Sequence, residues 1–390
     1  MATVFEHSFS REEYATRTER VRVEMARTGL DGLLLTAGAN LTYLSGYPSP
    51  ARSGSRPFAF VLPQRGDPIF IVQDGREREA HGYSWVADIR TYHDLSHAPL
   101  NLIVDTIHDA GLENGRIGAE VGPDQVLDLP VCDYLELRRM LPGARFADAG
   151  AALWPVRMRK SPAEINYVRQ ACAITTAAYA HTFATARAGM TEADVARLMA
   201  IATIEAGGNP WLLITSGAGN YDLATKHPSR RVLEPGDFVW MDAGCSVGGY
   251  WSDFSRAGVV GEPTREQRDA QRRIHDITMR GVELIRPGIT TGDVARCCNA
   301  AIADLPLPLT SCISCLAARI GHGLGSVTTE LPHVADDDET VLAPGMILTV
   351  EPGVATSYGT FHVEENVLVT ESGHEVLSTA CRELATIALA

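Results

Sequence analysis

The sequence predicts an α+β protein in which a smaller α/β domain precedes a larger domain built from two similar halves, each made of helices followed by a β-hairpin. Three observations lead to this prediction: a nine-residue segment that occurs twice, a strong helix start between the domains, and two glycine-containing hairpin patterns after the repeats. A chain of 390 residues is too long for one ordinary hydrophobic core, so two domains are expected.

The N-terminal part alternates helical and strand patterns. Residues 10–28 predict a helix, because Ser10 and Glu13 have the spacing of a capping box. Apolar or β-rich runs predict strands, and they lie within residues 29–38, 57–73 (two strands joined by a Gly-Asp-Pro turn), 116–122 and 145–150. This order predicts a small α/β domain with a mixed sheet over residues 1–154.

A strong helix start opens the second domain, which we assign to residues 155–390. Ser161 has the N-cap position, Pro162 the first helical position and Glu164 the third. This combination satisfies the free amides of a first helical turn. The helix is expected to run to about Ala188, ahead of a glycine.

An internal repeat follows this helix. Residues 189–197 read GMTEADVAR and residues 288–296 read GITTGDVAR, so seven of nine positions are identical or a Met/Ile exchange. Chance similarity between two capped helices is the alternative explanation. The duplication is favoured because each copy is followed by a hairpin pattern, at residues 237–260 and 345–370. We expect two antiparallel sheets that face a shared cleft.

The first hairpin carries two aspartates. In an antiparallel pair, opposite residues have position numbers with a constant sum. Asp242 and Asp253 are opposite if the turn is centred at Val247-Gly248, and their Cβ atoms would then be roughly 5 Å apart. Like charges in this arrangement are destabilising, so a compensating positive charge is expected.

The second hairpin repeats this pattern with glutamates. Glu351 and Glu364 are opposite if the turn is centred at Ser357-Tyr358, although Pro352-Gly353 introduces the alternative of a bulge. A single acid of this kind is most often a solvated surface residue. Two pairs in duplicated contexts instead predict one cluster of four carboxylates.

His322 is the candidate fifth member, with Gly321 and Gly323 on either side and Gly325 close behind. Glycines beside a polar residue indicate backbone that passes close to other groups, and we expect them to let His322 fit beside the carboxylates. Four carboxylates and one imidazole suit two divalent cations, which would neutralise the four negative charges. Manganese, cobalt, iron and zinc all fit such a donor set.

Several motifs in these segments carry a family resemblance. They are MDAG, GYWSDFSR, GHGLG, TVEPG and HVEENVLVT, with KSPAEINYVRQA at the domain entry and YLSGY (43–47) in the N-terminal domain. The chain resembles the pita-bread metallopeptidase family of prolidases, proline aminopeptidases, methionine aminopeptidases and creatinases. The resemblance implies a pita-bread catalytic domain preceded by a creatinase/prolidase-type N-terminal domain.

The resemblance also implies a function and a ligand set. The implied enzyme is a dinuclear-metal hydrolase of the Xaa-Pro dipeptidase or aminopeptidase type, in which a metal-bridging hydroxide attacks the amide bond before proline. The implied proton carrier is Glu351, and His227 stands where the family places a histidine near the leaving group. Manganese is the expected ion, with cobalt, zinc or iron as alternatives, and the implied metal ligands are Asp242, Asp253, His322, Glu351 and Glu364.

Two positions depart from the peptidase pattern. Thr329 replaces a histidine that helps to stabilise the tetrahedral intermediate, while the adjacent Glu330 is retained. His362 replaces an arginine that helps to hold a substrate carboxylate. We therefore regard Thr329 and His362 as substrate-binding positions together with His227.

These departures keep other functions open. One alternative is a non-peptide C–N hydrolase that resembles creatinase or ectoine hydrolase, and another is a metal-dependent lyase acting on a small osmolyte. A non-catalytic module that binds protein partners is the third, but such modules usually lose metal ligands. The resemblance also implies a homodimer formed through the N-terminal domain, with residues 48–57 as a candidate loop that reaches a partner's site.

Charge and composition limit the partners. A formal net charge of −14 argues against binding to nucleic acid or to an anionic membrane surface, and the expected partner is a small peptide or amide. We see no signal peptide and no long apolar run, so a cytoplasmic location with reduced thiols is expected. Cys312 and Cys315 have C-x-x-C spacing, which leaves a redox or zinc role as an alternative.

Overall fold

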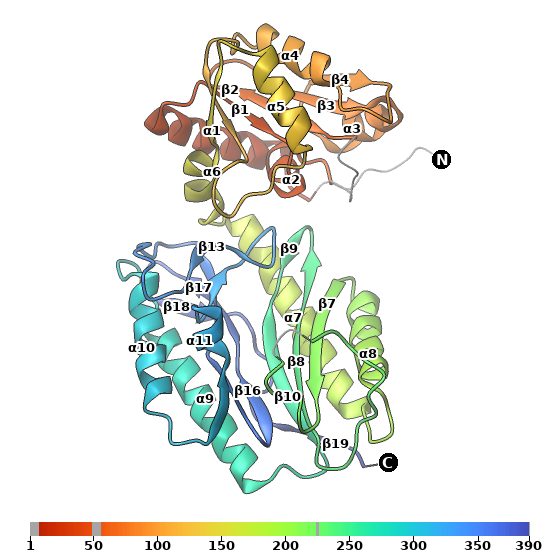
Figure 1. Cartoon of the computed structure of the whole chain (residues 1–390), viewed down its shortest axis with the longest axis vertical. Coiled ribbons are helices and arrows are strands. Elements are labelled where there is room, and N and C mark those ends of the chain that lie inside the picture. The colour runs from red at the N-terminus through yellow and green to blue at the C-terminus, as the bar shows by residue number, and fades with distance from the viewer. Residues whose placement is uncertain (1–7, 49–55, 224–225, 390) are drawn as a thin grey trace. The chain divides into compact units, whose positions relative to one another are not determined.

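The computed structural model describes residues 8–48, 56–223 and 226–389, so most of the candidate loop at 48–57 lies outside the described residues. The chain separates into two compact units, Met1–Arg157 and Met158–Ala390 (Figure 1). Among the described residues, no helix has both the length and the apolar character needed to span a membrane.

The first unit contains a mixed six-stranded sheet with the order β4-β3-β2-β1-β5-β6. Its strands are β1 (Gly32–Leu35), β2 (Ala59–Pro63), β3 (Ile69–Gln73), β4 (Asp88–Tyr92), β5 (Arg116–Ala119) and β6 (Arg145–Asp148). Its helices are α1 (Arg11–Thr28), α2 (Gly38–Ser45), the 3-10 turn η1 (Asp74–Arg76), α3 (Glu77–Tyr83), α4 (Leu100–Asp109), α5 (Val131–Met140) and α6 (Gly150–Arg157).

Both faces of this sheet are buried. Leu33 and Leu35 of β1 belong to one hydrophobic cluster, whereas Leu34 belongs to another. Successive side chains of a strand point to opposite faces, so helices must cover the sheet on both sides. The continuously apolar pattern of residues 29–38 follows from this burial, and the predicted mixed sheet is confirmed. Ser10 caps α1 by accepting from the amide of Glu13 at 3.2 Å.

The second unit contains five helices and three sheets among its described residues. The helices are α7 (Pro162–Thr185), α8 (Glu192–Glu205), α9 (Arg265–Leu284), α10 (Thr291–Ala303) and α11 (Ile313–Ala317). The strands are β7 (Asn209–Ser216), β8 (Phe238–Val247), β9 (Tyr250–Trp251), β10 (Phe254–Val260), β11 (Leu309–Cys312), β12 (His322–Gly323), β13 (Glu330–His333), β14 (Ile347–Val350), β15 (Gly353–Thr356), β16 (Gly359–His362), β17 (Glu365–Val369), β18 (His374–Val376) and β19 (Ala385–Ile387).

The two repeats occupy equivalent places. Thr191 caps α8 in a capping box with Asp194, and Thr290 caps α10 in the same way with Asp293. In the first half, α7 and α8 pack against β8 and β7, while in the second half α9 packs against β14 and β16 (Figure 1). Strand β10 of the first half contacts β16 and β17 of the second. The duplicated helix–hairpin arrangement is therefore confirmed, with helices outside and hairpins facing inward.

The predicted register of the first hairpin is wrong by two residues. Val247 pairs with Tyr250, and Asp242 pairs with Ser255 instead of Asp253. The two turn residues are Gly248 and Gly249, both with positive φ, as a tight two-residue turn of this kind requires. A shift of two residues leaves the aspartates diagonal to each other on the same face.

The register of the second hairpin is confirmed. Thr356 pairs with Gly359, and Val350 pairs with Glu365. The position numbers of these pairs have the same sum as those of Glu351 and Glu364, so the predicted pairing holds on both sides of the glutamates. Pro352 introduces no bulge here. The hairpin instead divides between two sheets, because β15 and β16 form a three-stranded sheet in which β15 pairs with β11, whereas β14 and β17 join β12, β13 and β18.

Candidate metal centre

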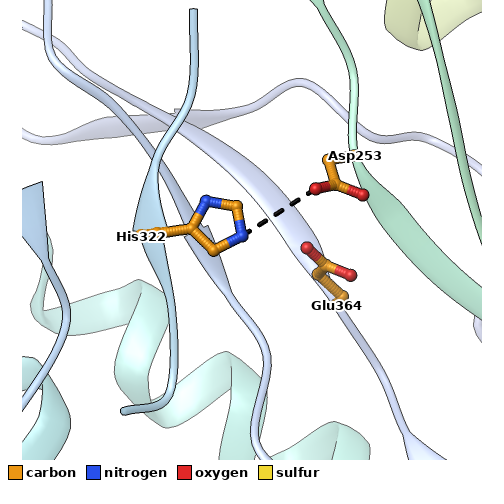
Figure 2. A group of neighbouring side chains, drawn as sticks. All are labelled: Asp253, His322 and Glu364. Atoms are coloured by element: carbon orange, nitrogen blue, oxygen red, sulfur yellow. Dashed lines mark ion pairs between the residues drawn. The ribbon is translucent and has the colours of Figure 1, made fainter. Parts of the chain in front are cut away.

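The five residues predicted as metal ligands come from five different segments and meet in the second unit. Asp242 lies on β8, Asp253 just before β10, and His322 on β12, while Glu351 follows β14 and Glu364 precedes β17. The Nε2 atom of His322 lies 3.3 Å from Oε1 of Glu351 and 3.8 Å from Oδ2 of Asp253. Figure 2 shows His322, Asp253 and Glu364 pointing toward one another, with donor atoms within 4.8 Å.

Hydrogen bonds fix the orientation of His322. Its Nδ1–H donates to the carbonyl of Gly323 at 3.0 Å, which leaves the Nε2 lone pair directed at the carboxylates. Its main-chain amide donates to Oγ1 of Thr349 at 3.0 Å, and that hydroxyl donates to Oε1 of Glu351 at 3.2 Å. Burial lowers the pKa of His322, which favours the neutral imidazole that binds metals.

The glycines on either side of His322 serve the neighbouring strands rather than the carboxylates. A Cβ atom on Gly321 would lie 2.1 Å from the carbonyl oxygen of Thr349, and one on Gly323 would lie 2.2 Å from that of Leu331. Strand β12 runs between β13 and β14, whose backbones approach it closely. The expectation of a close approach is confirmed, but its expected cause is corrected.

The carboxylates have oxygens that nothing in the described chain satisfies. Oδ1 of Asp242, Oδ1 of Asp253 and both oxygens of Glu364 are buried without a hydrogen-bond partner among the described residues. Burial, together with the neighbouring negative charges, raises the pKa of Asp253 and Glu364 well above their usual values, and burial raises that of Asp242 to about 6. Buried, unsatisfied carboxylates are costly unless cations balance them. The donor set therefore fits divalent metal ions.

Glu351 is held between two histidines. Its Oε2 lies 3.5 Å from Nε2 of His362, and this same nitrogen donates to the main-chain carbonyl of Glu351 at 2.8 Å. Burial alone would raise the pKa of Glu351, but hydrogen bonding to His362 and the charges of His322 and His362 lower it to about 2. Glu351 is thus ionised at neutral pH. His362 is buried, and together with Glu351 and Glu364 it forms a second group able to hold an ion.

The cluster opens into a cavity of about 320 Å³. Thr329 and His362 both line it, as predicted for substrate-binding positions. Glu330 does not, because it is buried and pairs with Nζ of Lys160 at 2.6 Å. His227 is exposed and is also absent from the cavity wall. The structure does not bring His227 to the cluster, and its role near a leaving group stays a prediction.

The expectation of reduced thiols is wrong for one pair of cysteines. Cys312 and Cys315 form a disulfide across the first turn of α11, with Cα atoms 5.2 Å apart. Between them, Ser314 accepts from the amide of Gly353 at 2.8 Å, and Ile313 and Ser314 line the cavity. The C-x-x-C spacing was compatible with this bond, but only the fold places the pair beside the cavity.

Three residues beside the predicted ligands escaped the sequence analysis. Asn366 accepts from the amide of Asp253 at 3.0 Å, and Arg256 donates to the carbonyl of Glu364 at 2.7 Å. Arg319 lines the cavity three residues before His322. Each of them lies within four residues of a predicted ligand, and this proximity was the one available signal.

Comparisons with known proteins agree with this fold. The family model described as metallopeptidase family M24 matches residues 166–371, and that of the creatinase/prolidase N-terminal domain matches residues 17–159. The chain therefore belongs to metallopeptidase family M24, and its pita-bread fold with a creatinase-like N-terminal domain is confirmed.

Several named relatives match this chain, and some of them cover almost all of it. A probable dipeptidase, PepE, from Mycobacterium tuberculosis is 29% identical over 388 residues, covering 97% of this chain and 98% of the relative. An ectoine hydrolase from Halomonas elongata is 27% identical, with 96% and 98% covered. An Xaa-Pro dipeptidase from Pyrococcus horikoshii is 29% identical, with 66% and 72% covered. The crystal structure of dipeptidase PepE from Mycobacterium ulcerans matches with a TM-score of 0.85 at 25% identity, covering 98% and 100%.

Proposed function

We propose that this M24 protein is a dinuclear-metal hydrolase that cleaves the amide bond of a dipeptide with proline in the second position. The observation that carries the proposal is the set of buried carboxylate oxygens without a partner in the described chain, grouped around the Nε2 atom of His322. The dipeptidase and Xaa-Pro dipeptidase names of relatives at 29% identity support the substrate class.

The proposed metal ligands are Asp242, Asp253, His322, Glu351 and Glu364, on the catalytic domain that we assign to residues 155–390. When bound, two divalent ions supply a water of lowered pKa as nucleophile and polarise the substrate carbonyl. Glu351 would take the proton of that water and pass it to the departing nitrogen. Manganese as the native metal, a homodimer and a cytoplasmic location are further proposals.

The substrate-binding positions have defined chemical limits. Thr329 can donate a hydrogen bond to a developing oxyanion, but it carries no positive charge. His362 offers Nδ1, which has no hydrogen-bond partner among the described residues, while its Nε2 is bonded to Glu351. These two side chains would contact the substrate from the cavity wall.

A non-peptide C–N hydrolase is the second candidate. The ectoine hydrolase relative at 27% identity supports it, as do the departures at Thr329 and His362. The two candidates differ in the substrate and share the metal centre.

A substrate screen of the manganese-loaded protein tests the proposal. Xaa-Pro dipeptides should be hydrolysed, and chelation should remove the activity until manganese or cobalt is added back. The comparison set contains longer Xaa-Pro peptides, creatine, ectoine and sulfonium osmolytes. If a fully metallated protein cleaves none of the Xaa-Pro compounds, the dipeptidase proposal is wrong, and turnover of ectoine or creatine would establish the second candidate.

Metal binding should depend on pH in a defined direction. Metals bind the ionised carboxylate, and burial raises the pKa of Asp242 to about 6. Manganese affinity should therefore fall by about tenfold or more per pH unit below pH 6, since at least one proton must be displaced. Calorimetric titration between pH 5 and 8 measures this, and an affinity that is flat between pH 5 and 7 would contradict the assignment.

A further inference from the structure

The cavity beside the carboxylate cluster contains a single permanently cationic side chain. Among the described residues that line it, Arg319 is the only arginine or lysine. The other walls are the acids and histidines of the cluster, the two threonines Thr328 and Thr329, and an apolar side that includes Trp211 and Ile313. A small substrate lying in this cavity therefore meets carboxylates, an apolar surface and one guanidinium.

The backbone directs Arg319 into this position. Helix α11 ends at Ala317, and Ala318 has a φ of 55°, in the left-handed region that a non-glycine residue seldom adopts. Ala318 lies in the segment between α11 and β12, and Arg319 is the next residue. Uncommon backbone conformations persist where the surrounding fold enforces them, and they occur often at functional sites.

The guanidinium of Arg319 has no anionic partner in the described chain. No carboxylate oxygen of the described residues lies within 4.0 Å of the Arg319 guanidinium, the distance expected of an ion pair. Acidic side chains nevertheless line both this cavity and a second hollow that Arg319 borders. Within the described chain its side chain makes one long hydrogen bond, from Nη1 to Nδ1 of His333 at 3.4 Å. Arginine offers five donors in a planar fork, so most of its donor capacity is available.

The charge of Arg319 nevertheless reaches the cluster. After the larger effects of burial and of neighbouring side chains, the Arg319 guanidinium contributes to lowering the pKa of Asp253 and of Glu351. Arg319 is thus close enough to act on a group held at the cluster, without being neutralised by it. His362 cannot offer an equivalent fork, since its Nε2 is bonded to the carbonyl of Glu351.

We propose that Arg319 is the specificity-determining residue for a substrate carboxylate, which its guanidinium binds while the scissile amide lies at the carboxylate cluster. This inference rests on the proposed hydrolase function and deepens it. It selects compounds whose free carboxylate lies within one residue of the scissile bond, as in a dipeptide, over peptide amides and longer peptides. Arg319 takes the place of the arginine that His362 replaces, from a different segment of the chain.

The test compares a dipeptide with its amide. The assay uses an Xaa-Pro dipeptide and the matching Xaa-Pro amide, and it compares the wild type with Arg319→Met and Arg319→Lys. Arg280→Met, at an exposed arginine of α9, is the control. Arg319→Met should lower kcat/KM for the dipeptide by about 10- to 100-fold, mainly through KM, and leave the amide nearly unchanged. Arg319→Lys should restore part of the loss, and Arg280→Met should resemble the wild type.

Two results would overturn the assignment. Equal losses on dipeptide and amide would mean that Arg319 acts on the reacting centre or on the fold, and no loss on either would mean that it does not contact the substrate. Manganese content and urea unfolding of each variant show whether the protein is folded and loaded.

A binding experiment separates this inference from the proposed function. Calorimetry with L-proline and L-prolinamide measures carboxylate recognition in the manganese-loaded protein without any turnover. If the wild type cleaves no Xaa-Pro dipeptide but binds proline more tightly than prolinamide, and Arg319→Met removes that preference, the function fails and the role of Arg319 stands. If the dipeptide is cleaved but the wild type shows no preference for the carboxylate, the role of Arg319 is wrong and the function stands.

Discussion

Replacing Asp242 by asparagine should abolish metal loading and activity while making the metal-free protein more stable. Asparagine keeps the shape of the side chain but removes the negative charge that a divalent ligand site needs. With one proposed ligand lost, bound manganese should fall below one ion per chain and hydrolysis to less than about 0.1% of the wild-type rate. Elemental analysis and the dipeptide assay measure the two effects.

The stability gain follows from the pKa of Asp242. Burial raises this pKa from 3.8 to about 6, so the group stabilises the folded state below pH 3.8, and this contribution is lost as the pH rises through 6. At pH 7.5 the ionised carboxylate therefore costs stability in the absence of metal. Asp242→Asn removes this cost and should raise the free energy of unfolding by on the order of 3 kcal/mol, since the shift is about two pKa units and each corresponds to about 1.4 kcal/mol.

The comparison needs chelator and a matched control. Urea unfolding in excess chelator at pH 7.5 and at pH 5 gives the pH dependence, and the gain should be smaller at pH 5. Asp222→Asn changes an exposed aspartate of the same unit and should alter neither metal content nor stability. A variant that keeps two ions per chain, or that is less stable than the wild type in chelator, would refute the assignment of Asp242.

The features that the sequence predicts well are local. Ser10 and Ser161 cap their helices as their spacing indicated, because such a cap depends on residues three positions apart. The hairpin register was less secure. The turn in the first hairpin was placed one residue too early, since only Gly248 and Gly249 together supply two positive φ angles. The side-chain period of two still left Asp242 and Asp253 on one face.

The features that escaped prediction depend on contacts between distant segments. Lys160 and Glu330 are 170 positions apart and form a buried pair, which removes Glu330 from the cavity. His227 was placed at the site by resemblance alone, and the structure leaves it exposed. The glycines beside His322 were understood as room for the cluster, but they make room for carbonyls of adjacent strands. None of these contacts has a signature in local spacing.

Arg256 should be one of the most sensitive positions for stability. It donates to Glu365 at 3.0 Å with both side chains almost fully buried, at 2% and 0% exposure, and it also donates to the carbonyl of Glu364 at 2.7 Å. Arg256→Met would leave a buried carboxylate short of one partner, a change that typically costs about 3–5 kcal/mol. Glu365 keeps its bonds from Arg382 and Ser378, so we expect the lower end, about 3 kcal/mol.

The same substitution should weaken metal binding, because Arg256 fixes the backbone that carries Glu364. Losing such a supporting contact lowers metal affinity by about 10- to 100-fold. Arg268→Met is the matched control: Arg268 pairs with Glu262 at 2.8 Å, but the two side chains are 53% and 78% exposed, and a surface pair contributes less than about 1 kcal/mol. Urea unfolding and manganese titration of both variants measure the contrast. If Arg256→Met costs no more stability than Arg268→Met, the buried pair does not hold the two hairpins together, and the placement of Glu364 must depend on other contacts of β17.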